Sequence, residues 1–165
     1  KAFECDAERI YAITLSSELS GSYNSAVLGK NLLLEEHPEK KIYVFNSGLR
    51  PGETLIAMKI EDVKAGLAFD EVVRTVEEYI SGQNTFFVLE KLDTLRKNGR
   101  LSGVKALVAT ALKIKPVMGS TDEGTICQLD QARGMNKALE NDGHIVSKTS
   151  EGEKKAAGYL HCNCP

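Results

Sequence analysis

Hydroxyl side chains are dense in the segment 14–26, TLSSELSGSYNSA, where an apolar run stops and a helical pattern begins. This order predicts a strand, a polar turn and the first turn of a helix. The first N–H groups of a helix have no partner within it, and the helix dipole places partial positive charge there. With the hydroxyls of Ser16, Ser17 and Ser20 beside them, these groups are suited to binding a carboxylate or a phosphate. Capping of the helix by Ser17 or Ser20 is the alternative explanation.

A second polar turn, Asn46-Ser47-Gly48, follows a second apolar run that extends from Lys41 to Phe45. This turn stands in the same relation to its strand as the first turn does. Ligands of open α/β sheets bind outside the carboxyl ends of the strands. We therefore expect Asn46 and Ser47 to lie at the same edge as the first turn, where Gly21 offers a backbone N–H group.

Strands and helices alternate through the first half of the chain. The helices are predicted from the helical spacing of apolar residues, from Pro near a start and from Gly near an end. This alternation predicts a parallel sheet with helices on its faces. The expected elements are strands over 10–15 and 41–45, and helices over 22–36, from Pro51-Gly52 to Gly66, and from an N-cap at Asp70 to Ser81-Gly82.

The pattern changes near residues 81–84, and we expect a second, smaller α/β subdomain with a mixed sheet beyond this point. The chain then divides into domains 1–83 and 84–165. It begins without Met and ends at Pro165 directly after an apolar run, so we expect the chain to be incomplete at both ends, with each domain lacking elements at its outer end. The elements expected in the second domain are a strand over 85–89, a short helix over 93–97, a helical apolar stripe over 104–112, a hairpin of 114–118 and 125–129 around Asp122-Glu-Gly124, a short helix over 134–140, a polar loop over 141–155 and a strand over 156–160.

The composition is typical of a soluble globular protein, since 42% of the 165 residues are hydrophobic and 27% are charged. The net charge of −2, with both signs interspersed, argues against a surface for nucleic acid. No apolar run approaches the ~18 residues of a membrane span. The four cysteines are scattered, which predicts reduced thiols and a cytoplasmic location. His161-Cys162-Asn163-Cys164 has no second pair of ligands elsewhere, so we expect neither a metal nor a cofactor.

Four segments, taken in order, resemble the signature of the DegV family. Residues 15–23, LSSELSGSY, resemble its SS-x-x-SG-T-Y motif, and residues 92–102, LDTLRKNGRLS, resemble its L-x-x-L-x-x-GGR-[IL]-S motif. Residues 112–117, LKIKPV, resemble L-x-[IV]-KP-[IV], and residues 161–165, HCNCP, resemble an H-x-N strand end. The resemblance covers the chain from Ile10 to Pro165.

This resemblance implies two α/β domains that hold a long-chain fatty acid between them and present it to a separate fatty acid kinase. It implies that the protein itself is not an enzyme. It also implies that Ser20 contacts the fatty-acid carboxylate and that Arg100, from the second domain, faces the same end of the pocket. The other residues implied to line that end are Ser16, Ser17, Asn46 and Ser47.

The sequence also departs from the family pattern. Asn98 replaces a Gly of the GGR motif, Ser22 replaces a Thr, and Asn46 replaces an Asp, which removes a negative charge near the expected site. The first strand of the family, with its Thr-Ser segment, and its late Gly- and His-containing segment have no counterpart in this sequence.

Two enzyme classes stay open as alternatives, and both would use the Ser16–Ser22 loop. A serine hydrolase needs a base beside its nucleophile, but the chain has no G-x-S-x-G motif and its histidines are His37, His144 and His161. An enzyme acting on a phosphorylated small molecule could bind the phosphate at the same helix start. A long apolar tunnel would instead indicate an acyl chain, whereas a module that only binds other proteins would have no closed pocket. The candidates for lining a tunnel are Phe86, Leu89, Leu92, Leu95, Leu107, Val108 and Ile114.

Overall fold

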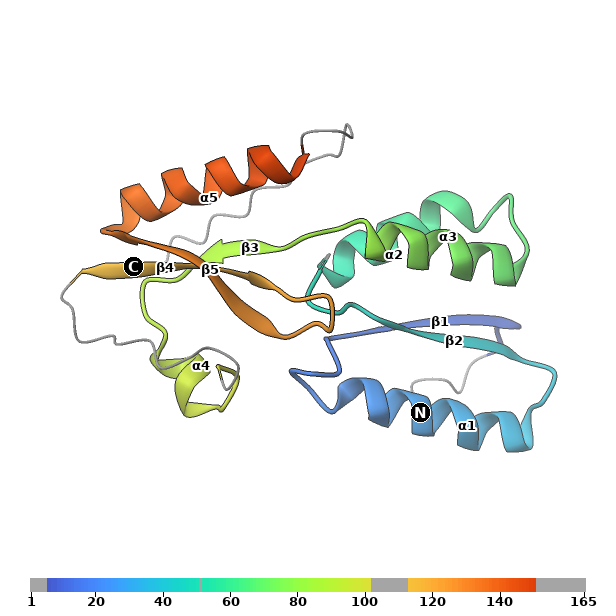
Figure 1. Ribbon diagram of the computed structural model, residues 1–165. Helices are drawn as coiled ribbons and strands as arrows, with labels where there is room; N and C mark the ends of the chain where they lie inside the picture. Colours follow the sequence, from blue (N-terminus) through green and yellow to red (C-terminus); the bar gives the residue numbers. More distant parts are fainter. Residues whose placement is uncertain (1–5, 51, 102–112, 151–165) are drawn as a thin grey trace.

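The computed structural model describes residues 6–50, 52–101 and 113–150, and its strands form two sheets (Figure 1). In the first sheet, β1 (Arg9–Thr14) and β2 (Lys41–Asn46) pair in parallel. Their register is regular, so that the last residues of the two strands lie opposite each other at one edge. The predicted parallel sheet is confirmed.

Helices cover both faces of this sheet. α1 (Ser22–Glu36) connects β1 to β2 across one face, while α2 (Glu53–Val63) and α3 (Phe69–Ser81) lie over the other face (Figure 1). α1 has the predicted bounds, and it ends where the N–H of His37 donates to the carbonyl of Leu33 at 2.8 Å. The prediction of helices flanking a parallel sheet is therefore confirmed.

The start of α3 differs from the prediction, which gave Asp70 the role of N-cap. The helix begins at Phe69, and Ala68 is its N-cap residue. The carboxylate of Glu71 accepts the N–H of Ala68 at 3.0 Å, which satisfies one of the donors exposed at the helix start. Phe69 is thereby drawn into the first turn, where its side chain is buried.

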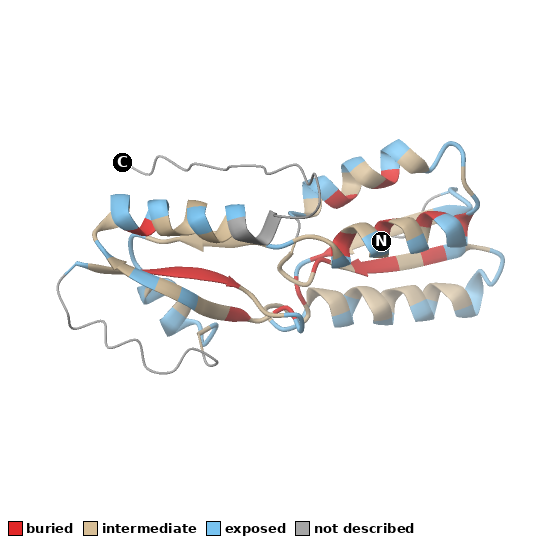
Figure 2. Ribbon diagram, turned by 45° about the horizontal axis from the view of Figure 1, so that its top comes forward, coloured by how far each residue is buried: buried red, intermediate tan, exposed pale blue. Residues whose placement is uncertain are grey.

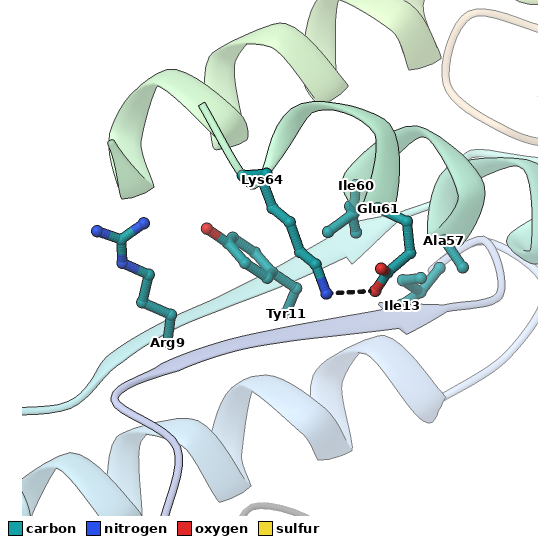
Figure 3. A pocket seen from close by; sticks show the side chains of 8 residues that line it. Arg9, Tyr11, Ile13, Ala57, Ile60, Glu61 and Lys64 are labelled. Atoms are coloured by element: carbon teal, nitrogen blue, oxygen red, sulfur yellow. Dashed lines mark hydrogen bonds and ion pairs between the residues drawn. The ribbon is translucent and has the colours of Figure 1, made fainter. Parts of the chain in front are cut away.

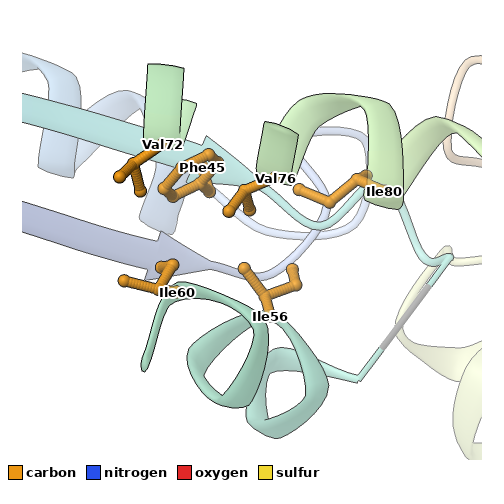
Figure 4. Close-up of a cluster of buried hydrophobic side chains, with 6 residues drawn as sticks. All are labelled: Phe45, Ile56, Ile60, Val72, Val76 and Ile80. Carbon is orange, nitrogen blue, oxygen red and sulfur yellow. The ribbon is translucent and has the colours of Figure 1, made fainter. Parts of the chain in front are cut away.

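The core of the first sheet lies between β2 and the two helices above it. Phe45 of β2 is fully buried, and the buried residues of α2 and α3 recur at intervals of three or four, as one face of a helix requires. Each such side chain contributes roughly 1.5–3 kcal/mol through burial. The six residues of this cluster are Phe45, Ile56, Ile60, Val72, Val76 and Ile80 (Figure 4).

The second sheet is antiparallel in the order β3–β4–β5, with β3 (Phe86–Val88), β4 (Ile114–Ser120) and β5 (Ile126–Arg133). β4 and β5 form the predicted hairpin, which is confirmed. β3 is shorter than predicted and ends with Val88 opposite Val117. The next position of β4 is Pro116, which has no N–H to donate to a neighbouring strand, so the ladder stops there.

The second sheet carries α4 (Asp93–Lys97) beside it and α5 (Met135–Ser150) packed against it (Figure 1). The strands of the two sheets fall on either side of the predicted boundary between residues 83 and 84. That boundary stays a prediction. Figure 2 shows the buried residues concentrated in β2, in the helices over it and in β4.

The prediction of a short helix over 134–140 followed by a polar loop is wrong. A single helix, α5, runs through Asn141-Asp142-Gly143 to Ser150. These three residues are weak helix formers, but the helix packs along the second sheet and its Ala138 is completely buried. Burial of one helix face therefore outweighs local propensity. The predicted stripe over 104–112 and strand over 156–160 lie outside the described residues.

Asp142→Asn is expected to stabilise the fold at pH 7. The Oδ1 atom of Asp142 is buried without a hydrogen-bond partner among the described residues, and burial raises the pKa of this carboxyl above its usual 3.8. A raised pKa in the folded state means that stability falls as the pH rises through it, and the neutral amide removes that loss. The gain at pH 7 should be no more than about 1 kcal/mol, because the group is partly exposed.

Urea unfolding of both proteins between pH 4 and pH 7 measures this effect. The difference in the free energy of unfolding should shrink as the pH falls toward the ordinary pKa of Asp. Asp62→Asn is the matched control, since Asp62 is exposed on α2 and should show no such pH-dependent gain. Equal stability of Asp142→Asn and wild type at pH 7 would contradict the expectation.

Candidate functional site

The polar edge, which we define as residues 14–22 and 46–50, lies at the carboxyl ends of β1 and β2. The parallel register brings the two loops together, and the N–H of Ser47 donates to the carbonyl of Thr14 at 3.1 Å just beyond the strands. The Thr14 hydroxyl donates to the carbonyl of Phe45 at 3.1 Å. Two turns that are distant in sequence therefore form one continuous surface, as the sequence pattern predicts.

Asn46 joins the two loops through its side-chain amide. Its Oδ1 accepts the N–H of Ser17 at 3.2 Å and that of Gly48 at 3.1 Å, while its Nδ2 donates to the Ser17 hydroxyl at 2.9 Å. An amide can both accept and donate in this way, whereas an aspartate at this position could only accept. Asn46 and Ser17 therefore hold the two loops in a fixed relation.

Ser16 and Ser47 are buried within the polar edge, with only 1% and 2% of their surfaces exposed. The Ser16 hydroxyl donates to the carbonyl of Gly124 at 2.7 Å and accepts the N–H of Glu18 at 3.3 Å. The carbonyl of Ser16 accepts the N–H groups of Leu19 and Ser20, each at 3.0 Å. The hydrogen bonds of Ser16 therefore fix the conformation of residues 16–20.

Ser20 and Gly21 stand at the start of α1. Gly21 is the N-cap residue and makes no side-chain capping bond, so capping by Ser17 or Ser20 in the predicted form is not observed. The Ser20 hydroxyl instead accepts the N–H of Ser22, the first helical residue, at 3.2 Å. Among the described residues, the hydroxyl proton of Ser20 has no acceptor. The buried hydroxyl of Ser22 has no hydrogen-bond partner among them either. Donors for an anion are therefore present at this helix start.

Arg100 reaches the polar edge from the turn that follows α4. It follows α4 across a turn in which Gly99 has a φ of +69°, a value that favours glycine. Its Nε donates to the carbonyl of Leu19 at 2.9 Å, and its Nη1 donates to the carbonyl of Asn98 at 2.6 Å. Arg100 therefore lies against the residue that precedes Ser20, with its charge exposed at the helix start.

Two residues that sequence reasoning missed, Arg50 and Gly124, also hold the polar edge together. Gly124 occupies the β4–β5 turn with a φ of +86°, and a Cβ there would lie 2.7 Å from the Ser16 hydroxyl. Arg50 donates to the carboxylate of Asp122 in the same turn at 2.6 Å. The sequence signals the turn through Asp122-Glu-Gly124, but nothing in the sequence indicates which surface the turn contacts.

Two surface hollows of the described part of the chain lie away from the polar edge. One, of about 470 Å³, lies between β1 and α2, where the buried Tyr11 hydroxyl has no described partner and burial raises its pKa (Figure 3). The other, of about 310 Å³, is lined by Asp130, Asn141, His144 and Ile145. Neither includes a predicted site residue.

Of the predicted tunnel lining, Phe86, Leu89, Leu92, Leu95 and Ile114 are half-buried, and Leu107 and Val108 lie outside the described residues.

No histidine among the described residues is hydrogen-bonded to a serine of the polar edge. His37 follows the last residue of α1, so the whole helix, about 22 Å long, separates it from Ser20. His144 lines the smaller hollow, and His161 lies outside the described residues.

Within residues 6–50, 52–101 and 113–150, no group of three or more His, Cys, Asp or Glu side chains could hold a metal ion. The helices within these ranges are too short or too polar to cross a membrane.

A family model described as "Uncharacterised protein, DegV family" matches residues 1–165. A DegV domain-containing protein of Streptococcus pneumoniae is 42% identical over 142 residues, which cover 85% of this chain and 50% of that protein. The chain spans about half the length of the curated relatives it matches.

Two crystal structures show the same fold. A DegV family protein of Ruminococcus gnavus, refined with vaccenic acid, is 62% identical with a TM-score of 0.84, and the match covers 90% of this chain and 53% of that one. The Fatty Acid Kinase (Fak) B3 protein of Streptococcus pneumoniae, loaded with linoleic acid, is 39% identical with a TM-score of 0.80 over the same shares.

Gly124→Ala is expected to destabilise the fold more than Gly134→Ala does. Both glycines have nearly the same φ, +86° and +85°, so the strain of adding a Cβ is the same, roughly 1 kcal/mol. Only at Gly124 would the Cβ also collide with Ser16 and with Gly48, whose nearest atoms are 3.0 Å away. The additional loss should be about 1–3 kcal/mol, measured by urea unfolding of both variants. Equal losses would show that the turn does not press on the polar edge.

Proposed function

Because the chain belongs to the DegV family, we propose that it forms part of a protein that binds a long-chain fatty acid. The observation that carries this proposal is the placement of Arg100 against the loop that ends in Ser20, at the start of α1. The similar proteins of R. gnavus and S. pneumoniae, whose structures hold vaccenic and linoleic acid, support the same class of ligand.

The carboxylate would be held at the polar edge. The Ser20 hydroxyl proton, the N–H groups near Gly21 and the guanidinium of Arg100 provide donors and positive charge in one place. Hydrogen bonds to a charged group are stronger than those between neutral groups, and the planar guanidinium matches a carboxylate geometrically. Ser16, Ser17, Asn46 and Ser47 would shape this end of the site by holding the loops.

The acyl chain would supply most of the binding free energy. Each buried methylene contributes roughly 0.8 kcal/mol, so ~15 methylenes contribute on the order of 12 kcal/mol before the entropy of association is subtracted. The carboxylate contacts would then chiefly fix the orientation of the ligand. The proposed tunnel would run between the domains 1–83 and 84–165. Its lining would come from the residues named for it above, which are Phe86, Leu89, Leu92, Leu95, Leu107, Val108 and Ile114.

The full-length protein would act as a carrier rather than an enzyme. It would work in the cytoplasm and present the bound fatty acid to a separate kinase subunit. The similarity to the pneumococcal Fak B3 protein supports this role. Exposure of Arg100 at the surface also supports it, because a carboxylate that is to be phosphorylated has to be accessible to a partner.

Native mass spectrometry of the full-length protein purified from bacteria, followed by lipid extraction, tests the proposal directly. We expect a fatty acid of long chain length to co-purify. Absence of any bound fatty acid, together with no uptake of added vaccenic or linoleic acid, would contradict the proposed function.

Ser20→Ala and Arg100→Ala are each expected to weaken fatty-acid binding by roughly tenfold, because each removes a hydrogen bond to the charged carboxylate. Displacement of a fluorescent fatty acid measures the affinity, and thermal unfolding confirms that each variant is folded. The matched controls are Ser25→Ala, which is exposed on α1, and Arg96→Ala, which removes an exposed arginine of α4 that pairs with Asp93 at 3.3 Å. Unchanged affinity in both test variants would remove Ser20 and Arg100 from the site.

A further inference from the structure

Arg50 connects three segments that are far apart in the sequence. Its Nη1 donates to the carbonyl of Ser81 at the end of α3 at 2.6 Å, and its Nη2 donates to the carboxylate of Asp122 at 2.6 Å. Its own carbonyl accepts the hydroxyl of Thr85, just before β3. The side chain of Arg50 is only 15% exposed although that of Asp122 is 96% exposed. The arginine is therefore enclosed between the first sheet and the β4–β5 turn.

The loop that carries Arg50 is itself fixed. The N–H of Arg50 donates to the carbonyl of Ser47 at 3.0 Å, and Ser47 is buried in the polar edge. Gly48 and Leu49 have φ values of +60° and +57°, and for leucine this left-handed conformation costs energy. A strained turn of this kind persists only where its surroundings hold it, which here places the guanidinium at the end of a rigid segment.

A second contact lies beside the first. Gly124, two residues after Asp122, accepts the Ser16 hydroxyl at 2.7 Å and packs against Gly48. The β4–β5 turn is thus attached to the polar edge at two points, one through Arg50 and one through Ser16. We call this pair of contacts the clasp.

The clasp bears on Arg100 through the second sheet. β4 pairs with β3, and Lys115 of β4 donates to the carbonyl of Glu90 just beyond β3 at 2.7 Å, from where the chain continues through α4 to Arg100. A shift of the β4–β5 turn away from the polar edge would therefore carry Arg100 away from Leu19 and Ser20. We infer that Arg50 is a positioning residue, which fixes the Arg100 side of the site against the Ser20 side by holding the β4–β5 turn on the polar edge.

Hydrogen exchange tests the clasp without any ligand. The N–H groups of Glu18, Leu19 and Ser20 all donate to Ser16, whose hydroxyl the clasp holds. In the full-length protein, Arg50→Gln should raise the exchange rates of these amides at least fivefold, while Arg50→Lys, which keeps one charged donor, should lie between Arg50→Gln and wild type. Arg74→Gln is the matched control, since Arg74 pairs with Glu78 on the exposed face of α3 and should leave these rates unchanged. Unchanged exchange in Arg50→Gln would overturn the inference.

A double-mutant cycle tests positioning of the site, and this part rests on the proposed function. With cis-parinaric acid as the probe, Arg50→Gln should weaken binding about fivefold in the wild-type background and leave it unchanged in the Arg100→Ala background. Independent, additive losses would show that Arg50 only stabilises the fold and would overturn its positioning role. If the wild type binds no fatty acid, the proposed function fails, and the exchange experiment alone decides whether Arg50 holds the turn.

Discussion

The parallel register of β1 and β2 is the constraint on which the rest of the structure depends. It places Thr14 opposite Asn46, so the loops that follow the two strands begin at the same edge and within hydrogen-bond reach of each other. The bond from Ser47 to Thr14 and the amide of Asn46 then continue the pairing beyond the strands. A shift of one residue in this register would turn Phe45 out of the core and separate Asn46 from Ser17.

The core under α2 and α3 maintains this register. Phe45 is fully buried between the helices and the sheet, and Tyr11 of the neighbouring strand stacks on Phe69 with ring centres 5.1 Å apart. The opposite face is held more loosely, because no residue of α1 is fully buried and Leu28 and Leu32 remain exposed. The polar edge therefore derives its rigidity from the α2–α3 side and from its own hydrogen bonds.

The sequence could predict those features that depend on local pattern. The strands, the bounds of α1 and the β4–β5 hairpin follow from periodicity and turn residues, and these predictions are confirmed. The start of α3 and the length of α5 were beyond such patterns, because a Glu71 bond to the backbone decided the first and burial of Ala138 the second. Arg50 and Asp122 are 72 positions apart, and no periodicity links residues at that distance. The nearness of Arg100 to the Ser20 loop came only from the family resemblance, since residue types alone would have left Arg100 as an exposed turn residue.

The seven residues predicted for the site separate into two groups by what their hydrogen bonds already do. Ser16, Ser17, Asn46 and Ser47 are engaged with the backbone or with each other, and these bonds shape the loops. Ser20 and Gly21 keep donors at the helix start, and Arg100 keeps its charge exposed beside them. This division has a thermodynamic consequence. The entropic cost of ordering the loops is incurred when the protein folds, so a ligand that binds the remaining donors does not incur that cost again. A site arranged in this way depends on contacts that never touch the ligand, which is why the clasp at Arg50 and Gly124 matters to the chemistry proposed for Ser20 and Arg100.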